Sequence, residues 1–250
     1  MKKYLIRSLC LTGLLLIHLF LSAQNKTKEV NHQTQSWVSV NSTIHMNDKW
    51  ALLADVHMRR NHFFKNGSFY FIRAGVAYSI TKNFSVAAGY AHLWLAPTTT
   101  SWITYANENR IYQQLQYHSS IGKIEINQRL RNEQRWQQKM VNDKPSRQNR
   151  FTNRIRYLLS ATIPVFKNEN LPSLVISDEL HIQFGKEVMY NTFDQNRFFT
   201  GIKQKINKQL SFDIGYMQVL QQKYNGYQYD LNNTFRLFFY YSPWLKKKVN

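Results

Sequence analysis

The chain has 250 residues, 43% hydrophobic and 15% aromatic, which is enough for one large domain or a single all-β barrel and does not require two domains. Its 33 Lys and Arg against 14 Asp and Glu give a formal net charge of +19, an excess that raises nucleic acid or anionic membrane surfaces as partners. The single cysteine, Cys10, excludes an internal disulfide.

Residues 1–23 have the pattern of a cleaved secretory signal peptide. Basic residues at positions 2, 3 and 7 precede an apolar run over 9–21, and Ser22 and Ala23 come before Gln24. The alternative is a single membrane anchor, but the run is shorter than the ~20 residues that a spanning helix needs. Cleavage near Ala23 would remove Cys10 and lower the formal charge from +19 to +16.

Export would change which partners the positive charge implies. It argues against a nucleic-acid partner, because the mature chain would leave the cytoplasm. A basic protein in the envelope of a Gram-negative cell meets phosphorylated lipids and lipopolysaccharide instead.

A polar N-terminal segment, 24–35, precedes segments in which apolar and polar residues alternate with period two, as in β-strands with two different faces. No helix of useful length is indicated. The clearest predicted strands are 50–60, 69–80, 84–94, 123–136, 151–163 and 233–241, and weaker ones lie at 36–46, 105–118, 171–184, 196–206 and 210–220.

The segment "KIEINQRLRNEQRW", 123–136, shows the alternation most clearly. On a helix its polar groups would scatter around the circumference, whereas on a strand they share one face. Ile124, Ile126 and Leu130 form the opposite, apolar face. The ionic face consists of Lys123, Glu125, Asn127, Arg129, Arg131, Glu133 and Arg135.

The predicted connections alternate in length. Tight turns are expected at 47–49, 81–83, 119–122 and 207–209, and longer polar loops at 61–68, 95–104, 137–149, 185–194 and 221–227. Short turns at one rim and long loops at the other are typical of an outer-membrane barrel. A soluble β-sandwich is the alternative. Strands of ten residues or more favour the barrel, because a tilted membrane strand needs ~9–11 residues.

Aromatic residues gather near the predicted strand ends, as in the belts at membrane interfaces. The alternative is that they are core residues of an ordinary sheet. The predicted belt residues are Trp37, Trp50, Tyr78, Phe84, Trp94, Trp102, Tyr112, Tyr117, Trp136, Tyr157, Tyr240, Tyr241 and Trp244.

Eleven strands are counted, but bacterial single-chain barrels close with an even number, so we expect ten or twelve through one merged or missed strand. The predicted fold class is therefore all-β: a transmembrane antiparallel up-and-down β-barrel of 10 to 12 strands over 36–241. A basic C-terminal tail, 242–250, follows, in which Lys246, Lys247 and Lys248 face solvent or anionic headgroups.

With hydrocarbon outside, the ionic face of 123–136 would turn into the lumen. One interpretation is structural: guanidinium forks and carboxylates hold the wall of a narrow barrel together. The other is an anion-selective or phosphate-binding lumen, because arginine outnumbers glutamate there. The predicted lumen network is Glu108, Arg110, Arg129, Arg131, Glu133, Arg135, Arg154, Arg156, Glu179 and Arg197.

The succession "ENRIYQQL", "QRLRNEQRW", "RFTNRIRYLLSATIPV", "SDEL", "FDQNRFFTGI" and "DIGYMQ" resembles the bacterial family Domain of Unknown Function 2490, over about 37–241. The resemblance rests on the ten residues of the lumen network together with Asp194 and Gly201. It implies an outer-membrane β-barrel and brings no activity, cofactor or catalytic site.

A hydrolase hypothesis rests on "YHSSIGK", 117–123, where His118 and Ser120 have the spacing of a base beside a hydroxyl, with Asn132 to orient the imidazole. The pair is similar to that of outer-membrane phospholipases and lipid A deacylases. The Asn-Gly that often follows their serine is absent, and the triplet opens a predicted turn, so no enzyme activity is expected. The dispersed histidines nominate no metal site, and no cofactor is predicted.

We therefore expect a monomeric protein of the outer membrane, surrounded by lipid and lipopolysaccharide. Three functions stay open. The first is porin-like passage or binding of small anionic solutes; the second is a structural or envelope-assembly role with a plugged lumen; the third is lipid hydrolysis by His118 and Ser120.

Overall fold

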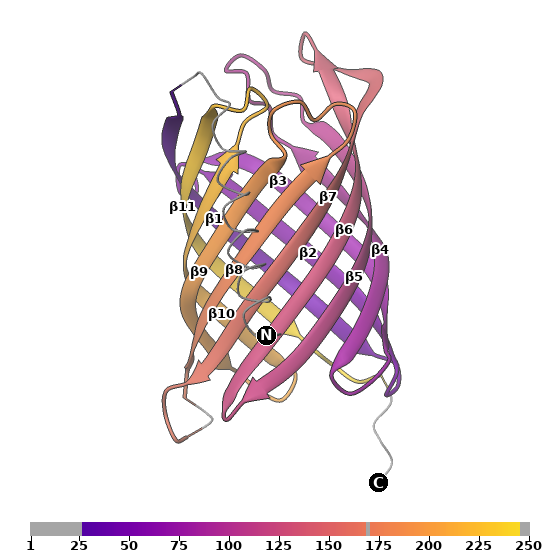
Figure 1. Ribbon diagram of the computed structural model, residues 1–250, viewed down its shortest axis with the longest axis vertical. Helices are drawn as coiled ribbons and strands as arrows, with labels where there is room; N and C mark the ends of the chain where they lie inside the picture. Colours follow the sequence, from indigo (N-terminus) through magenta and orange to yellow (C-terminus); the bar gives the residue numbers. More distant parts are fainter. Residues whose placement is uncertain (1–26, 169–170, 246–250) are drawn as a thin grey trace, which may run out of the picture.

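The alternating segments become eleven β-strands that close into a barrel in the computed structural model, which describes residues 27–168 and 171–245 (Figure 1). The predicted signal peptide, 1–23, and Lys246, Lys247 and Lys248 lie outside the described residues. No helix in these two ranges is long and apolar enough to cross a bilayer. The strands are β1 (Glu29–His45), β2 (Trp50–Asn61), β3 (Asn66–Ser79), β4 (Phe84–Leu95), β5 (Ala106–Ile121), β6 (Ile124–Val141), β7 (Lys144–Pro164), β8 (Ser173–Phe184), β9 (Phe193–Lys205), β10 (Leu210–Gln222) and β11 (Gln228–Tyr241).

The strand count of eleven is confirmed, and the preference for ten or twelve strands is wrong. Strands that run alternately up and down leave the first and the last parallel when their number is odd. The barrel closes through such a pair, β1 beside β11, in register from Glu29 opposite Gln228 to Ser42 opposite Tyr241. A parallel ladder also satisfies the backbone groups of both edges, so closure does not require an even number.

The parallel closure also explains where β1 begins and where β11 ends. β1 begins at Glu29, inside the stretch 24–35 that the sequence predicts to be a polar segment, because β11 supplies backbone partners from Gln228 onward. The start of β1 and the end of β11 consequently lie at opposite rims. Past β11, residues 242–245 remain attached to the wall, where the Trp244 ring stacks on His45 with centroids 4.7 Å apart.

Two of the predicted long loops are tight turns instead. β2 and β3 are joined by 62–65, and β6 and β7 by 142–143. Asn142 and Asp143 both have positive φ, 50° and 57°, the conformation of a two-residue hairpin turn that Asn and Asp tolerate. β6 and β7 therefore continue as a hairpin above the rim (Figure 1).

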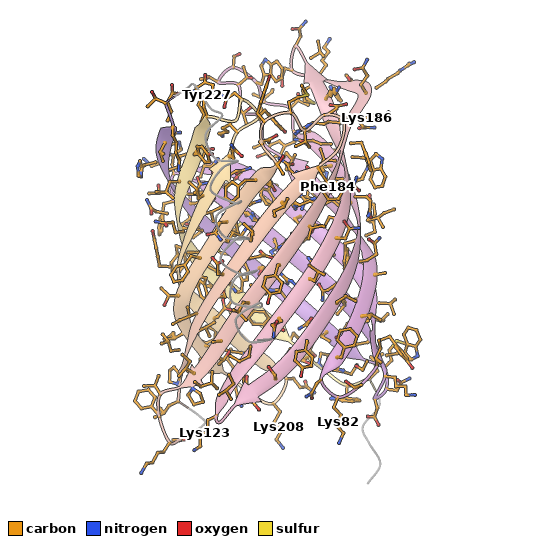
Figure 2. The ribbon with its side chains drawn as sticks, viewed as in Figure 1. Lys82, Lys123, Phe184, Lys186, Lys208 and Tyr227 are labelled. Carbon is orange, nitrogen blue, oxygen red and sulfur yellow. The ribbon has the colours of Figure 1, made fainter. Side chains whose placement is uncertain are left out.

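Side chains alternate between the outside and the inside of the wall. On β6, Leu130 is 43% exposed on the outside, whereas Arg131 is 3% exposed and faces the interior. On β3, Ile72 and Val76 lie outside, and Arg73 inside. The predicted ionic face of 123–136 is thus the inner one, except that Lys123 lies in the β5–β6 turn at the rim (Figure 2).

The aromatic belt is only partly as predicted. Trp50, Trp94 and other predicted belt residues are exposed on the outer wall. Trp37 and Tyr112, however, are 3% and 1% exposed and face the interior, and Tyr240 lines the same cavity. These three have the inward parity of their strands, so alternation overrides the preference of an aromatic ring for an interface.

Glycine pairs leave room for two of the interior rings. Gly75 and Gly89 face each other across β3 and β4, and a Cβ on Gly89 would lie 2.7 Å from Cε1 of Tyr112. Gly201 likewise faces Gly215, and its added Cβ would lie 2.7 Å from Cζ of Phe199. Real Cβ atoms do not approach other atoms so closely, so the rings occupy space that side chains at these positions would need.

We expect Gly89→Val to lower the free energy of unfolding by about 1–3 kcal/mol, because the new side chain overlaps the backbone of Ala74 and Gly75 on β3 as well as the Tyr112 ring. Urea unfolding of the purified protein in detergent micelles measures the change. Ala88→Val is the matched control, since Ala88 is exposed on the outer wall. Equal unfolding midpoints for the two variants would show that the fold does not depend on the absence of a side chain at Gly89.

Candidate functional site

Strand register brings opposite charges together on the inner wall. Asp55 lies directly opposite Arg73 across β2 and β3, and the two form an ion pair. Glu133 is opposite Arg154 across β6 and β7, and Glu179 opposite Arg197 across β8 and β9. Side chains directly opposite on neighbouring strands are close enough to interact, so these three pairs follow from the register alone.

The same register also opposes like charges. Arg110 faces Arg135 across β5 and β6, and Arg131 faces Arg156 across β6 and β7. Such pairs repel unless carboxylates lie between them. Glu108 supplies this charge for the first pair: its Oε1 accepts from Arg110 Nε at 2.5 Å and from Arg135 Nε at 2.9 Å.

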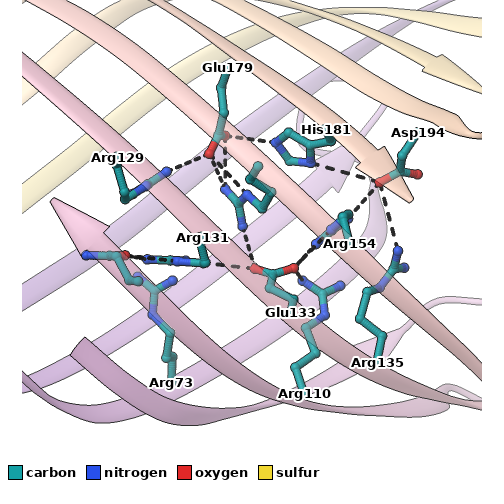
Figure 3. A network of polar contacts seen from close by, with 12 residues as sticks. Arg73, Arg110, Arg129, Arg131, Glu133, Arg135, Arg154, Glu179, His181 and Asp194 are labelled. Atoms are coloured by element: carbon teal, nitrogen blue, oxygen red, sulfur yellow. Dashed lines mark hydrogen bonds and ion pairs between the residues drawn. The ribbon is translucent and has the colours of Figure 1, made fainter. Parts of the chain in front are cut away.

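Glu133 is the centre of the network (Figure 3). Its Oε2 accepts from Arg154 Nε at 2.9 Å, and its Oε1 from Arg156 Nη1 at 2.8 Å. Arg110 and Arg131 approach the same carboxylate to 3.7 and 3.9 Å. Glu133 is 3% exposed, so four guanidiniums replace the water that a buried carboxylate would otherwise need.

Glu179 forms a second centre that joins strands two apart. Its Oε1 accepts from Arg129 Nη2 at 2.6 Å and from Arg156 Nη2 at 2.7 Å. Its Oε2 lies 3.3 Å from Arg197 Nη1 and 3.0 Å from Nε2 of His181. Because Arg156 contacts both Glu133 and Glu179, the two centres form one continuous network (Figure 3).

The structure places all ten residues of the predicted lumen network inside the barrel, and each makes at least one charged contact there. Arg131 additionally bonds to Gln114 and lies over the Tyr112 ring, 4.8 Å from its centroid. The role of this network in binding remains a prediction.

Sequence reasoning left out several members of the interior. Asp194, which entered only through the resemblance, accepts from Arg154 Nη1 at 2.8 Å, and His181 was not nominated. Apart from Asp194, which lies inside through a register shift in the β8–β9 ladder, each missed residue has the inward parity of its strand, which is the signal that would have found it. The other missed residues are Asp55, Arg59 and Arg73 on β2 and β3, and Asp213 and Arg236 on β10 and β11.

The interior carries a surplus of positive charge at its centre. Ten arginines face six carboxylates in this cluster. The carboxylates are Asp55, Glu108, Glu133, Glu179, Asp194 and Asp213; the arginines are Arg59, Arg73, Arg110, Arg129, Arg131, Arg135, Arg154, Arg156, Arg197 and Arg236.

A cavity of about 2000 Å³ extends along the barrel interior. Its lining includes Asn47 and Lys82 at the rim of the β1–β2 and β3–β4 turns, and His62 and Thr99 at the opposite rim. Arg197, near the middle, lines it as well. The positive surplus therefore faces a space large enough for a small solute rather than a filled core.

A loop covers part of the rim at which the β6–β7 hairpin projects. The segment 96–105 between β4 and β5 is attached to the β6–β7 hairpin through Asp143, whose carboxylate accepts from the backbone N–H of Thr104 at 2.8 Å and of Ile103 at 3.1 Å. The Thr104 N–H bond, together with that of Ile103, holds the pKa of Asp143 below its ordinary value. Acidification below that pKa would release this end of the loop.

The proposed triad of the hydrolase hypothesis does not assemble. His118 and Ser120 are both exposed at the turn rim, and Nε2 of His118 lies 2.9 Å from the Gln116 side chain. Asn132 donates instead to Gln113 at 3.1 Å, on the outer wall. The orienting role predicted for Asn132 is therefore wrong, because it has the opposite parity. The described residues contain no group of three metal-ligating His, Cys, Asp or Glu side chains.

A family model described as "Protein of unknown function (DUF2490)" matches residues 34–241. The matched range includes all of the network described above. No curated protein and no solved structure matches the chain.

We expect Glu133→Gln to lower the free energy of unfolding by about 3–5 kcal/mol, because it leaves buried guanidiniums without their shared carboxylate. Urea unfolding in detergent micelles measures this. Glu125→Gln on the same strand is the control: Glu125 is exposed near the rim, so its replacement should change stability by about 0.5 kcal/mol or less. Equal losses would refute a central role for Glu133.

Proposed function

The chain belongs to the DUF2490 family of proteins of unknown function, and from the two faces of its barrel wall we propose an outer-membrane protein whose lumen admits small anions. The family name assigns no activity. The proposal therefore rests on what surrounds the outer wall and what the inner wall attracts.

The outer wall supports insertion in a membrane. Val56, Leu115 and Ile155 are 60%, 44% and 41% exposed on three different strands, and similar residues continue around the barrel. Burial of one such side chain contributes about 1.5–3 kcal/mol, which a bilayer would supply and water would not. The shortest strands have 12 residues and β7 has 21, enough to cross the ~30 Å hydrocarbon core at a tilt.

The single observation that carries the anion proposal is the surplus of arginine over carboxylate around the cavity. In a narrow lumen with low-dielectric walls, fixed charges of one sign attract counter-ions and repel co-ions. At one rim, Lys82 lines the cavity and extends the positive potential to that entrance (Figure 2).

A plugged lumen with a structural or envelope-assembly role is the second candidate. The burial of Glu133 and Arg154, which are 3% and 2% exposed, favours it, because ion pairs fixed so firmly reinforce the wall and occupy part of the interior. Conductance distinguishes the two candidates.

We expect the barrel to reside in the outer membrane, with the rim of the β1–β2, β3–β4, β5–β6 and β9–β10 turns in the periplasm. Because successive strands alternate in direction, Lys28 before β1 and Lys186 in the β8–β9 loop share one rim, and Lys208 in the β9–β10 turn lies at the other. Introduced cysteines, Lys28→Cys and Lys186→Cys, should react with a membrane-impermeant maleimide on intact cells, whereas Lys208→Cys should react only after lysis. Labelling of Lys208→Cys together with protection of Lys28→Cys would reject this orientation.

In planar bilayers we expect the reconstituted protein to conduct and, in a KCl gradient, to show a reversal potential that favours Cl⁻ over K⁺. Arg197→Gln should shift that potential toward zero, because it removes a cation that lines the cavity. Lys186→Gln removes the same charge in an exposed loop and should leave selectivity unchanged. A folded, inserted protein without conductance would support the plugged alternative.

A further inference from the structure

We propose that Arg59 and its neighbours on the Trp37 ring form a binding site for the phosphate group of a small solute, an inference that rests on the lumen being open to anions. The site consists of Trp37 on β1, His57 and Arg59 on β2, and Arg197 on β9. All four residues line the central cavity.

Arg59 differs from the other nine arginines of the cluster. Each of those nine has a carboxylate within ion-pair distance, but none of the ion pairs in the described parts of the chain includes Arg59. Register places it between two aromatic residues, Trp37 and Phe69, and its guanidinium carbon lies 3.3 and 4.1 Å from their ring centroids. The rings hold the cation without cancelling its charge.

A second guanidinium shares the same ring. The guanidinium carbon of Arg197 lies 5.0 Å from the Trp37 centroid, so cations from β2 and β9 converge on one indole. Arg110, Arg154 and Arg156 also act electrostatically on Arg59, and no carboxylate is among its strongest charged neighbours. Like charges brought together in this way repel, and an anion between them would remove the repulsion.

Unpaired polar atoms point to the same place. Nε of Arg59 and Nε2 of His57 are buried without a hydrogen-bond partner. The two residues are two positions apart on β2, so both side chains face the interior. Buried polar groups normally have partners, and a ligand bound in the cavity would supply them. His57 is positioned by two rings, Phe71 and Phe238, whose centroids lie 4.8 and 5.6 Å from its own.

These features favour phosphate over simpler anions. A phosphate offers three or four acceptor oxygens and nearly two negative charges, so it can accept from Arg59, Arg197 and His57 at once. Chloride offers a single centre, and a carboxylate only one negative charge in a plane. The aromatic faces beside Arg59 would accommodate the organic part of a phosphate monoester.

The test uses the full-length mature chain, folded in maltoside micelles that contain no phosphate, and isothermal titration calorimetry. Inorganic phosphate and glycerol 3-phosphate are the probes, and short-chain phosphatidylglycerol distinguishes a lipid headgroup from a free solute. We expect saturable binding of the two soluble phosphates. Arg59→Gln should weaken it at least tenfold, and Arg59→Lys, which keeps the charge but not the planar fork, should weaken it less.

Arg60→Gln is the matched control, because Arg60 follows directly in the chain but its guanidinium bonds to the carbonyl oxygens of Phe64 and Lys65 in the β2–β3 turn. Its affinity for phosphate should equal that of the parent. Heat-modifiable migration on gels verifies that each variant is folded. Three results would overturn the site. Arg59→Gln could bind phosphate as tightly as the parent, the folded parent could bind no phosphate, or only the lipid could bind.

The calorimetric test of the phosphate site and the conductance test of the anion-admitting lumen can fail independently of each other. Anion-selective conductance without saturable phosphate binding would remove the site and leave the pore. Phosphate binding that depends on Arg59, in a protein without conductance, would keep the site and convert the lumen from a passage into a binding pocket.

Discussion

The constraint on which this structure depends is the two-residue period of a strand in a closed wall. Once the barrel closes, every side chain faces either the enclosed interior or the surroundings, and a slip of one residue would exchange the two sets. Leu130 and Arg131 illustrate the consequence: adjacent in the chain, they lie on opposite sides of β6. Glu133 and Glu179, which the alternation sends inward, are almost fully buried, so they need cationic partners, and the network around them is the result.

Closure with an odd number of strands has a second effect. The parallel pairing of β1 and β11 lets the chain use a polar stretch, from Glu29 onward, that would make a weak strand alone, because backbone hydrogen bonds do not depend on side-chain polarity. It also separates the start of β1 from the end of β11 by the height of the barrel. Glu29, at the start of β1, and Tyr241, at the end of β11, therefore lie at different rims.

The sequence predicts the strands and the inner face of the barrel but not how the strands meet. Alternation is local, so the ionic face of 123–136 is legible in "KIEINQRLRNEQRW" without any partner. The contact of Arg129 with Glu179, two strands away, depends on register and shear, which no single segment encodes. The sequence does not predict the Asn142–Asp143 turn, for a different reason. The residues on both sides of it are polar and resemble a loop, but they extend β6 and β7 as paired strands. Trp37 was misplaced because its residue type was given more weight than its parity.

The choice of arginine, and of rings beside it, explains how the interior keeps its positive charge. Guanidinium stays protonated at any physiological pH, so the cluster cannot relieve its repulsion by losing protons, as lysines or histidines in the same place would. Carboxylates such as Glu133 offset part of the charge, but each of them also fixes its arginines against the wall. At Arg59 two aromatic faces take the place of a carboxylate, and they hold the cation without neutralising it. In the proposed anion-admitting lumen, a mobile anion from solution would supply the countercharge that the wall lacks at this point.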